Sequence, residues 1–478
     1  MKRWLSVTLA CAMAFAVVST FVACGGNPGG SDETPDIVGD FPLVPLDGDE
    51  SRVTIVRDGG LNVDAGYAEI MIPKKSATIG DEYAKSPSVA LPYLFTKALH
   101  NYNVTNNNIS LEYLDWGWGE SLMQKSEAAF KAGSGVDILI GESQMPGYAQ
   151  RGELQPFPDW LADLVRETMH PVCYKAMEID GKIYGVAANP AVCVLIWNKS
   201  VLRTAGVDEK YIDQAPETWE EFLTVCEQIY NAGLSGIKYG AGGFYAGNNY
   251  GGYLRIAPFI GQAGGKFVDS EGNLTFNDAN NATALEFLRD VSRYNMDATL
   301  IPLNEDTLYT QFTRSKLAYL VDGSWRISMM KESGMDVGYG AIPSPTGTEN
   351  NNIAIGAAYL SVPSYVNPTR AENAFKVIAS HLSEEVQSII VNHGIRPCSN
   401  LSLAASEEYS QVNPIQSYVY SLMDRADILA LPSFRQDASK IWMAFGEAME
   451  KAADSNYYST SIADLLRQAQ TKASEFIK

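Results

Sequence analysis

The chain contains little cysteine and little histidine, and neither residue is spaced as a metal site requires. Only six Cys and four His occur among 478 residues, and no CxxC or HxxxH pattern is present. A chain of this length with so few cysteines is not held together by a disulfide framework. The missing spacings argue against a structural zinc site and a zinc-protease helix, so we expect neither a metal nor a cofactor. The sequence leaves open whether any disulfide forms among Cys173, Cys193, Cys226 and Cys398.

Basic residues are also scarce. The chain has 36 Lys and Arg against 56 Asp and Glu, a formal net charge of -20, and no run rich in Lys or Arg. A protein that neutralises the phosphates of a nucleic acid needs a basic surface. Nucleic acid is therefore excluded as a partner.

Two common catalytic motifs are missing. No GxSxG nucleophile elbow occurs. The segment 264–266 (GGK) resembles the end of a phosphate-binding P-loop, but Phe267 follows where Ser or Thr is required, and Ile260 replaces the first Gly. Paired carboxylates of a glycoside hydrolase are not recognisable in a sequence, because their separation is a three-dimensional quantity. A glycan-processing enzyme therefore stays open as an alternative function.

Long apolar runs are limited to one, at the start of the chain. Lys2 and Arg3 precede an uncharged apolar run over residues 4–23, and Cys24 follows directly. A basic start, an apolar run and small residues before a Cys match a bacterial lipoprotein signal. We expect residues 1–23 to be a signal peptide, Cys24 to carry lipid, and residues 24–50 to be a flexible tether rich in Gly, Pro and Asp. The alternative is an uncleaved membrane anchor.

The remainder alternates between strand and helix patterns. The length favours two or three lobes, and 46% hydrophobic residues are enough for a substantial core. Thr218 and Thr369 each stand three residues before a Glu, as in a capping box that begins a helix. Strands are expected at 52–56, 109–114, 136–140 (a buried parallel strand) and 191–197, and helices at 89–102, 121–131, 218–229, 369–382, 436–453 and 462–476. This alternation predicts an α/β fold with helices on both faces of the sheets.

Several motifs in a fixed order resemble a known family. The motifs are VDILI followed by GYAQRGEL at 136–154, IYGV followed by LIWNK at 183–199, APETWEEF at 215–222, QAGG at 262–265, and FTRSKLAYLVDGSW at 312–325. Together they resemble the extracellular solute-binding proteins of carbohydrate ABC transporters, the class that includes maltose-binding protein. Val136 replaces the usual Pro of the first motif, and the segment 62–88 is longer than the corresponding loop of the family.

The resemblance implies a two-lobed periplasmic-binding-protein fold, or Venus flytrap. Each lobe is a mixed sheet flanked by helices, and the ligand cleft lies between the lobes. The N-terminal lobe is expected at 51–192 with 345–400, and the C-terminal lobe at 193–344 with 401–478. The hinges are expected near 189–194 and 344–354.

The resemblance also suggests site residues. Trp325 matches the position of the sugar-stacking Trp of the family, and an aromatic face suits the apolar C–H face of a pyranose. Amides and phenols in loops can bond sugar hydroxyls in both donor and acceptor sense, and carboxylates can accept from them. The expected ligand-binding residues are Trp325, Trp116, Trp118, Glu142, Gln144, Tyr245, Asn248, Tyr250, Tyr359 and Trp442, although the last also fits a helix core with Ile441, Phe445 and Met449.

The function that the resemblance implies is binding without catalysis. The expected protein is extracytoplasmic and monomeric, and it is attached to the cell membrane through its N-terminal lipid. It binds a sugar or oligosaccharide and delivers it to the permease subunits of an ABC transporter.

Overall fold

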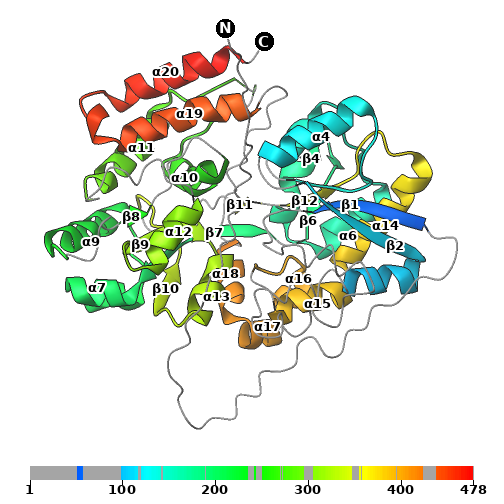
Figure 1. Cartoon of the computed structure of the whole chain (residues 1–478), viewed down its shortest axis with the longest axis horizontal. Helices are drawn as coiled ribbons and strands as arrows, with labels where there is room; N and C mark the ends of the chain where they lie inside the picture. The colour runs from blue at the N-terminus through cyan, green and yellow to red at the C-terminus, as the bar shows by residue number, and fades with distance from the viewer. Residues whose placement is uncertain are drawn as a thin grey trace, which may run out of the picture. The chain divides into compact units, whose positions relative to one another are not determined.

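The computed structural model (Figure 1) describes most of the chain after residue 97, together with one early strand. The segments are 51–57, 98–116, 120–141, 144–188, 190–234, 242–243, 250–269, 271, 273–294, 305–346, 355–356, 358–393, 396–423 and 438–476. The expected signal peptide, Cys24 and the tether lie outside the described residues, as does the 89–97 part of the first expected helix.

The elements alternate along the chain as the sequence predicts. The strands are β1 (Ser51–Arg57), β2 (Ile109–Asp115), β3 (Leu139–Gly141), β4 (Glu178–Ile179), β5 (Lys182–Ile183), β6 (Val186–Ala187), β7 (Ala191–Asn198), β8 (Gly242–Gly243), β9 (Tyr319–Gly323), β10 (Val337–Gly340), β11 (Ile355–Gly356) and β12 (Tyr359–Ser361). The longer helices are α4 (Glu120–Ala132), α6 (Asp159–Thr168), α9 (Trp219–Asn231), α10 (Tyr250–Gln262), α11 (Ala279–Ser292), α12 (Glu305–Thr313), α13 (Trp325–Glu332), α14 (Pro368–Leu382), α15 (Glu384–His393), α18 (Pro414–Met423), α19 (Ala438–Ala453) and α20 (Ile462–Ser474). The shorter helices are α5 (Met145–Gln150), α7 (Lys199–Ala205), α8 (Glu209–Asp213), α16 (Leu401–Ala404) and α17 (Glu407–Val412), and residues 98–107 are also helical.

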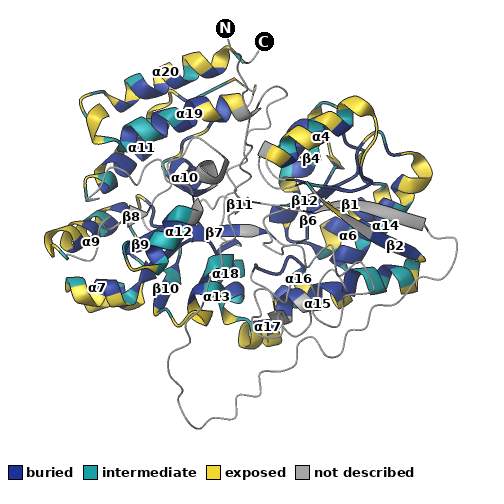
Figure 2. Cartoon of the chain, in the orientation of Figure 1, coloured by how far each residue is buried: buried dark blue, intermediate teal, exposed yellow. Residues whose placement is uncertain are grey.

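Two groups of strands organise the chain, the first antiparallel and the second mixed. β12 lies between β3 and β6 and runs antiparallel to both. β7 lies between β9 and β10, again antiparallel to both, and β8 adds to β9 in parallel. β1 and β2 form a separate parallel pair. Helices pack against these strands with their buried faces inward (Figure 2).

Strand β7 contributes to two hydrophobic cores. Val192, Val194 and Ile196 belong to a core that also contains residues of β3, β6, β12 and α14, which we name core 1. Cys193, Leu195 and Trp197 belong to a core built with α9, α10, α11, α19 and α20, which we name core 2. Successive side chains of a strand point to opposite faces, so one uninterrupted apolar strand joins the two cores.

The predicted strands and helices that fall on described residues are present, with two corrections. The 136–140 segment is buried as expected, but its strand is shorter, Leu139–Gly141, and it pairs antiparallel with β12 instead of in parallel. An apolar run reveals burial on both faces but not the direction of the neighbour. The helix expected from Thr369 begins at Pro368, because the side chain of Asn367 caps it by accepting from the Arg370 backbone N–H.

The other predicted capping box is confirmed. The Thr218 hydroxyl accepts from the backbone N–H of Glu221 at 3.1 Å, and the Glu221 carboxylate accepts from the backbone N–H of Glu217 at 2.8 Å. The first bond satisfies an N–H group that the first turn of α9 leaves without a helical partner, and the second holds the residue before the cap.

The four cysteines after residue 24 are free and buried. Burial raises the pKa of Cys173 and of Cys398 to about 12, so both remain protonated thiols at neutral pH. Within the described segments, no helix is long and apolar enough to cross a membrane.

A buried histidine in α14 predicts a loss of stability in mild acid. His381 is buried, its Nδ1 lies 2.9 Å from the Val377 carbonyl oxygen, and burial lowers its pKa from 6.5 to about 4. Between these two pKa values the unfolded chain binds a proton that the folded chain does not. The free energy of unfolding therefore falls as the pH drops below about 6.5.

At pH 5 the contribution of His381 amounts to about 2 kcal/mol relative to neutral pH. Urea unfolding at pH 7.5 and pH 5 gives the drop in the free energy of unfolding between these two pH values. We expect this drop to be about 2 kcal/mol smaller in His381→Gln than in the wild type. Equal losses in the two proteins would show that His381 is not buried in its neutral form.

Candidate functional site

Trp325 lies at the first position of α13, immediately after a buried strand and a tight turn. All five residues of β9 are buried, and Gly323 and Ser324 connect this strand to α13. The side chain of Trp325 is partly buried. The location after a strand agrees with the sequence expectation for a residue at a ligand site.

Gly323 covers one face of the Trp325 ring. A Cβ atom built at Gly323 would lie 2.0, 2.1 and 2.2 Å from Cη2, Cζ3 and Cζ2 of Trp325. Three nearly equal distances place that point over the face of the six-membered ring, because a point beyond its edge would be near one atom only. Only a residue without a Cβ allows this approach. The face of the indole that lies on Gly323 is therefore closed to a ligand.

Arg396 lies over the same indole. Its guanidinium carbon is 5.2 Å from the Trp325 ring, which is within the range of a cation–π interaction. Arg396 is buried. It comes from a segment 71 positions further along the chain, so sequence neighbours do not set the orientation of Trp325 alone.

A buried ion pair holds the turn that carries Trp325. Asp322 accepts a short hydrogen bond from Arg255 of α10, and its Oδ1 also accepts from the backbone N–H of Gly323 at 2.7 Å. Arg326 places its Nε 3.6 Å from the other carboxylate oxygen and its guanidinium 4.3 Å from the ring centre of Tyr309. The side chains of Arg255 and Asp322 are 4% and 1% exposed, so water screens their attraction very little.

Two polar atoms next to Trp325 are buried without a hydrogen bond to any residue that the structure describes. Nε2 of Gln416, in α18, donates to the backbone oxygen of Ser324 at 3.3 Å. Oε1 of Gln416 and Oγ of Ser324 have no hydrogen-bond partner among the described residues. Buried polar atoms are normally satisfied, and an ordered water is the usual partner where protein groups do not reach. The surroundings of Trp325 are thus polar as well as aromatic.

A second group of expected site residues meets at the end of β3. Tyr359 of β12 pairs with Gly141, the last residue of β3. A Cβ atom built at Gly141 would lie 3.1 Å from Nε2 of Gln144, so this amide reaches back over the end of the strand. Tyr359 also pairs with Ala187, shortly before β7 begins. Trp116 is partly buried against core 1.

The segment that carries Arg396 is fixed at the start of β7. The Ser399 hydroxyl donates to the Ala188 carbonyl oxygen at 2.6 Å, and the Gln387 side-chain amide donates to the same oxygen at 3.1 Å. Both donors are buried. Ala188 lies between β6, which pairs with β12, and the start of β7. The segment that carries Arg396 is therefore attached to the chain just before β7 begins.

Several expected site residues lie outside the segments that the structure describes. Trp118, Glu142, Tyr245 and Asn248 are not among the described residues, and Tyr250 is described only as the first residue of α10. Their roles remain predictions.

Trp442 lies apart from both groups. It is 7% exposed in core 2, where its ring is 5.0 Å from that of Phe267 and stacks at 6.4 Å on that of Phe276. This position favours the core role that the helical spacing with Ile441, Phe445 and Met449 indicates, and we leave Trp442 out of the proposed site.

The site residues that the sequence did not suggest are Arg255, Arg396 and Gln416. Each contacts the segment 322–325 from a distant part of the chain. A buried Arg carries no local sequence signature in general. Arg255, however, stands in an otherwise apolar helical stretch at 254–260, and an unpaired buried charge would be costly there, so this position could have indicated a buried acidic partner.

Comparison with known proteins gives a family match over most of the described chain. The model of the family described as bacterial extracellular solute-binding protein matches residues 97–414. A curated relative, the arabinooligosaccharide-binding protein of Halalkalibacterium halodurans, is 28% identical over 183 residues, which are 36% of this chain and 37% of the relative. The maltotriose-binding protein of Pyrococcus abyssi is 23% identical over 224 residues, or 45% and 44% of the two chains. The matches thus span less than half of these two relatives.

Solved structures extend the likeness to nearly the whole chain. Maltose-bound MalE3 of T. maritima superposes with a TM-score of 0.68 over 89% of this chain and 99% of that chain, at 15% sequence identity. At this level of identity the likeness establishes the fold, which is the two-lobed fold of periplasmic binding proteins. The fold class expected from the sequence is confirmed.

Proposed function

Because the chain belongs to the family of bacterial extracellular solute-binding proteins, we propose that it captures a sugar or oligosaccharide between its two lobes and delivers it to the permease of an ABC transporter. The observation that carries the choice of ligand is the arrangement at Trp325. One face of its ring lies on Gly323, and Arg396 and a buried ion pair hold its surroundings. A rigid aromatic face beside polar groups suits a pyranose, which has apolar C–H faces and polar edges. The relatives named for their ligands bind arabinooligosaccharide and maltotriose.

The two proposed lobes keep the boundaries expected from the sequence. They are 51–192 with 345–400, and 193–344 with 401–478. The pairing of β7 supports a passage between lobes at this strand, because β7 pairs at Ala191 and Val192 with β11 of the first proposed lobe and from Cys193 on with β9 and β10 of the second. Trp325 falls in the second proposed lobe and Arg396 in the first, so their contact would change when the lobes move.

The proposed protein performs selection and no chemistry. Ligand shifts the lobes toward a closed state only by the difference in its affinity for the closed and open states. A permease that recognises the closed form would then distinguish loaded from empty protein. We propose that the protein acts as a monomer.

The experiment that tests this function combines calorimetry, scattering and a reducing-end assay. Full-length protein is titrated with arabino-, malto-, manno- and chito-oligosaccharides, and the radius of gyration is measured with and without the tightest ligand. We expect saturable binding, a smaller radius with ligand, and no increase in reducing ends on prolonged incubation. A growing reducing-end signal would favour the glycan-processing alternative, and the absence of binding to every sugar would contradict the proposed ligand class.

Anchoring is a separate part of the proposal and predicts the fate of Cys24. The apolar run, the small residues before Cys24 and the Gly-rich segment after it predict lipid attachment. We expect the mature wild-type protein to begin at a lipidated Cys24 and to fractionate with membranes, and Cys24→Ser to be unlipidated. Mass spectrometry of the N-terminal peptide checks both. An intact Met1, or cleavage at another bond, would contradict the prediction.

A further inference from the structure

A large pocket lies among helices that carry none of the described residues expected to bind ligand. Its volume is about 840 Å³, and α6, α14, α16 and the helix at 98–107 form its walls. Pockets that hold small molecules usually have volumes of about 300–1,000 Å³. Trp116, Gln144, Tyr359, Trp325 and Trp442, which are described, do not line it.

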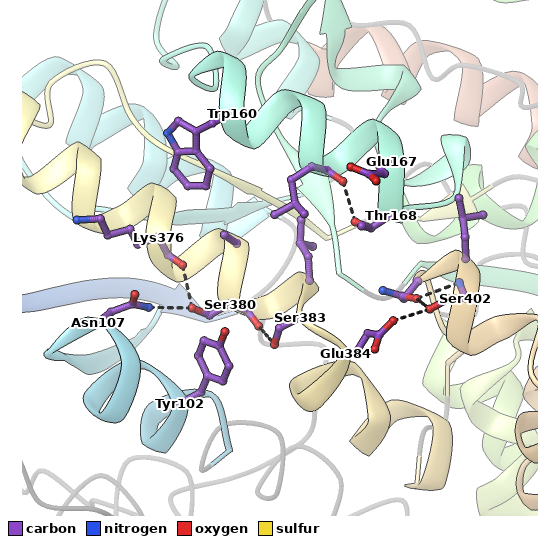
Figure 3. A pocket seen from close by; sticks show the side chains of 15 residues that line it. Tyr102, Asn107, Trp160, Glu167, Thr168, Lys376, Ser380, Ser383, Glu384 and Ser402 are labelled. Carbon is purple, nitrogen blue, oxygen red and sulfur yellow. Dashed lines mark hydrogen bonds between the residues drawn. The ribbon is translucent and has the colours of Figure 1, made fainter.

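The wall formed by α6 offers an aromatic surface. Trp160, Leu164, Glu167 and Thr168 line the pocket at the i, i+4, i+7 and i+8 spacing of one helix face. Trp160 is 48% exposed, although Trp has the largest side chain of all residue types. Figure 3 shows it across the pocket from Tyr102, with α14 between them.

The floor of the pocket is already satisfied by its own hydrogen bonds. Asn107 donates to the hydroxyl of Ser380 at 3.2 Å, and Ser380 donates to the Lys376 carbonyl oxygen at 2.8 Å (Figure 3). Asn107 also donates to Oδ1 of Asn103 at 2.9 Å. These bonds tie the helix at 98–107 to α14. The floor is therefore a fixed surface against which a ligand could rest.

The walls, in contrast, present polar groups that are not used. In the part of the chain that the structure describes, the indole N–H of Trp160, the hydroxyl of Tyr102 and the carboxylate of Glu167 make no hydrogen bond or ion pair. One is a donor, one is an acceptor, and the hydroxyl is both. Such a mixture in a pocket that also exposes an indole matches a ligand with apolar faces and many hydroxyls.

The charges of the lining exclude an anionic ligand. Lys376 is the basic residue of the lining, and its ammonium is 2.9 Å from the carboxylate of Glu372. Glu167 and Glu384 contribute two carboxylates, the second of which accepts from Ser402 at 2.8 Å. A phosphate or an acidic sugar would meet more negative than positive charge.

We propose that this pocket is a second glycan-binding site, which holds uncharged sugar units of a polysaccharide against Trp160. The site would keep the protein close to the polymer from which its transport ligand is released. It goes beyond the proposed function, since it shares no residue with the site at Trp325.

Native gels that contain a soluble neutral polysaccharide test the proposal. Full-length wild-type protein, Trp160→Ala and the control Tyr230→Ala are run through starch, β-glucan, xylan, mannan and arabinan. Tyr230 is a matched control because it is 42% exposed on α9. We expect at least one polymer to retard the wild type and the control, and Trp160→Ala to bind that polymer about tenfold more weakly or worse. Glu167→Ala is expected to show a smaller loss, which gives a second variant if Trp160→Ala does not fold.

Three results would overturn the second site. The first is that the polymer retards Trp160→Ala and Glu167→Ala as much as the wild type. The second is that no polymer retards the wild type. The third is that Trp325→Ala removes the retardation and Trp160→Ala does not, which would place the polymer at the Trp325 site. In each case calorimetry with short oligosaccharides still tests the proposed function separately, because Trp160→Ala should leave that affinity unchanged. A variant that lowers sugar uptake by cells but not polymer binding would assign the pocket to a protein partner instead.

Discussion

Replacement of Asp322 by alanine is expected to lower the free energy of unfolding by about 3–5 kcal/mol. The variant would leave the guanidinium of Arg255 buried without its counter-ion, since the two side chains are only 4% and 1% exposed. It would also remove the acceptor that Asp322 provides for the backbone N–H of Gly323. The loss of one partner from a buried pair costs far more than the pair itself contributes, because the remaining charge stays out of water.

The matched control is Asp336→Ala. Asp336 pairs with Arg203 at 2.6 Å, but both side chains are about half exposed, at 50% and 48%. Ion pairs in water contribute little to stability, so this variant should unfold close to the wild type in urea. If Asp322→Ala were no less stable than Asp336→Ala, the result would contradict the burial of the ion pair between Arg255 and Asp322. Asp322→Asn keeps an acceptor for Gly323 and should lie between the two.

Much of the fold could be predicted from local patterns. The apolar run at 191–197 becomes β7, and the capping box at Thr218 begins α9, because burial and capping depend on residues close in sequence. The direction of β3 could not be predicted in the same way, since its partner β12 lies more than 200 residues away. The true cap of α14, Asn367, was missed because Asn367 and Thr369 are both good capping residues, and only the backbone path distinguishes them.

The site was predictable only in part, for a similar reason. The sequence motif suggested Trp325, and Gly323 in that motif has a physical role, since its missing Cβ lets the indole lie on the backbone. The partners Arg255, Arg396 and Gln416 depend on long-range packing that no spacing reveals. Trp442 shows the opposite case: the resemblance suggested a ligand contact, whereas its helical spacing with Phe445 correctly indicated the core.

Trp325→Ala is expected to weaken sugar binding by about 2 kcal/mol, or roughly thirty-fold in the dissociation constant. Trp325 is partly buried, and one face of its ring lies on Gly323 while the guanidinium of Arg396 lies over the ring. The ring is therefore already ordered before ligand arrives, and little entropy is lost when a sugar stacks on it. Calorimetric titration measures the binding loss, and thermal melting without ligand should show a small change only.

Two further variants separate binding from folding at this position. Trp442→Ala removes an aromatic ring from core 2 and should cost about 3–5 kcal/mol of stability, while the surviving folded protein binds sugar normally. Gly323→Ala keeps Trp325 but places a methyl group where the ring now lies, so the indole must move and sugar binding should fall although no ligand contact has been deleted. If Trp325→Ala instead melted much earlier and bound sugar as well as the wild type, Trp325 would be a core residue like Trp442. Its place beside Arg396 would then stabilise the fold and would not contribute to recognition.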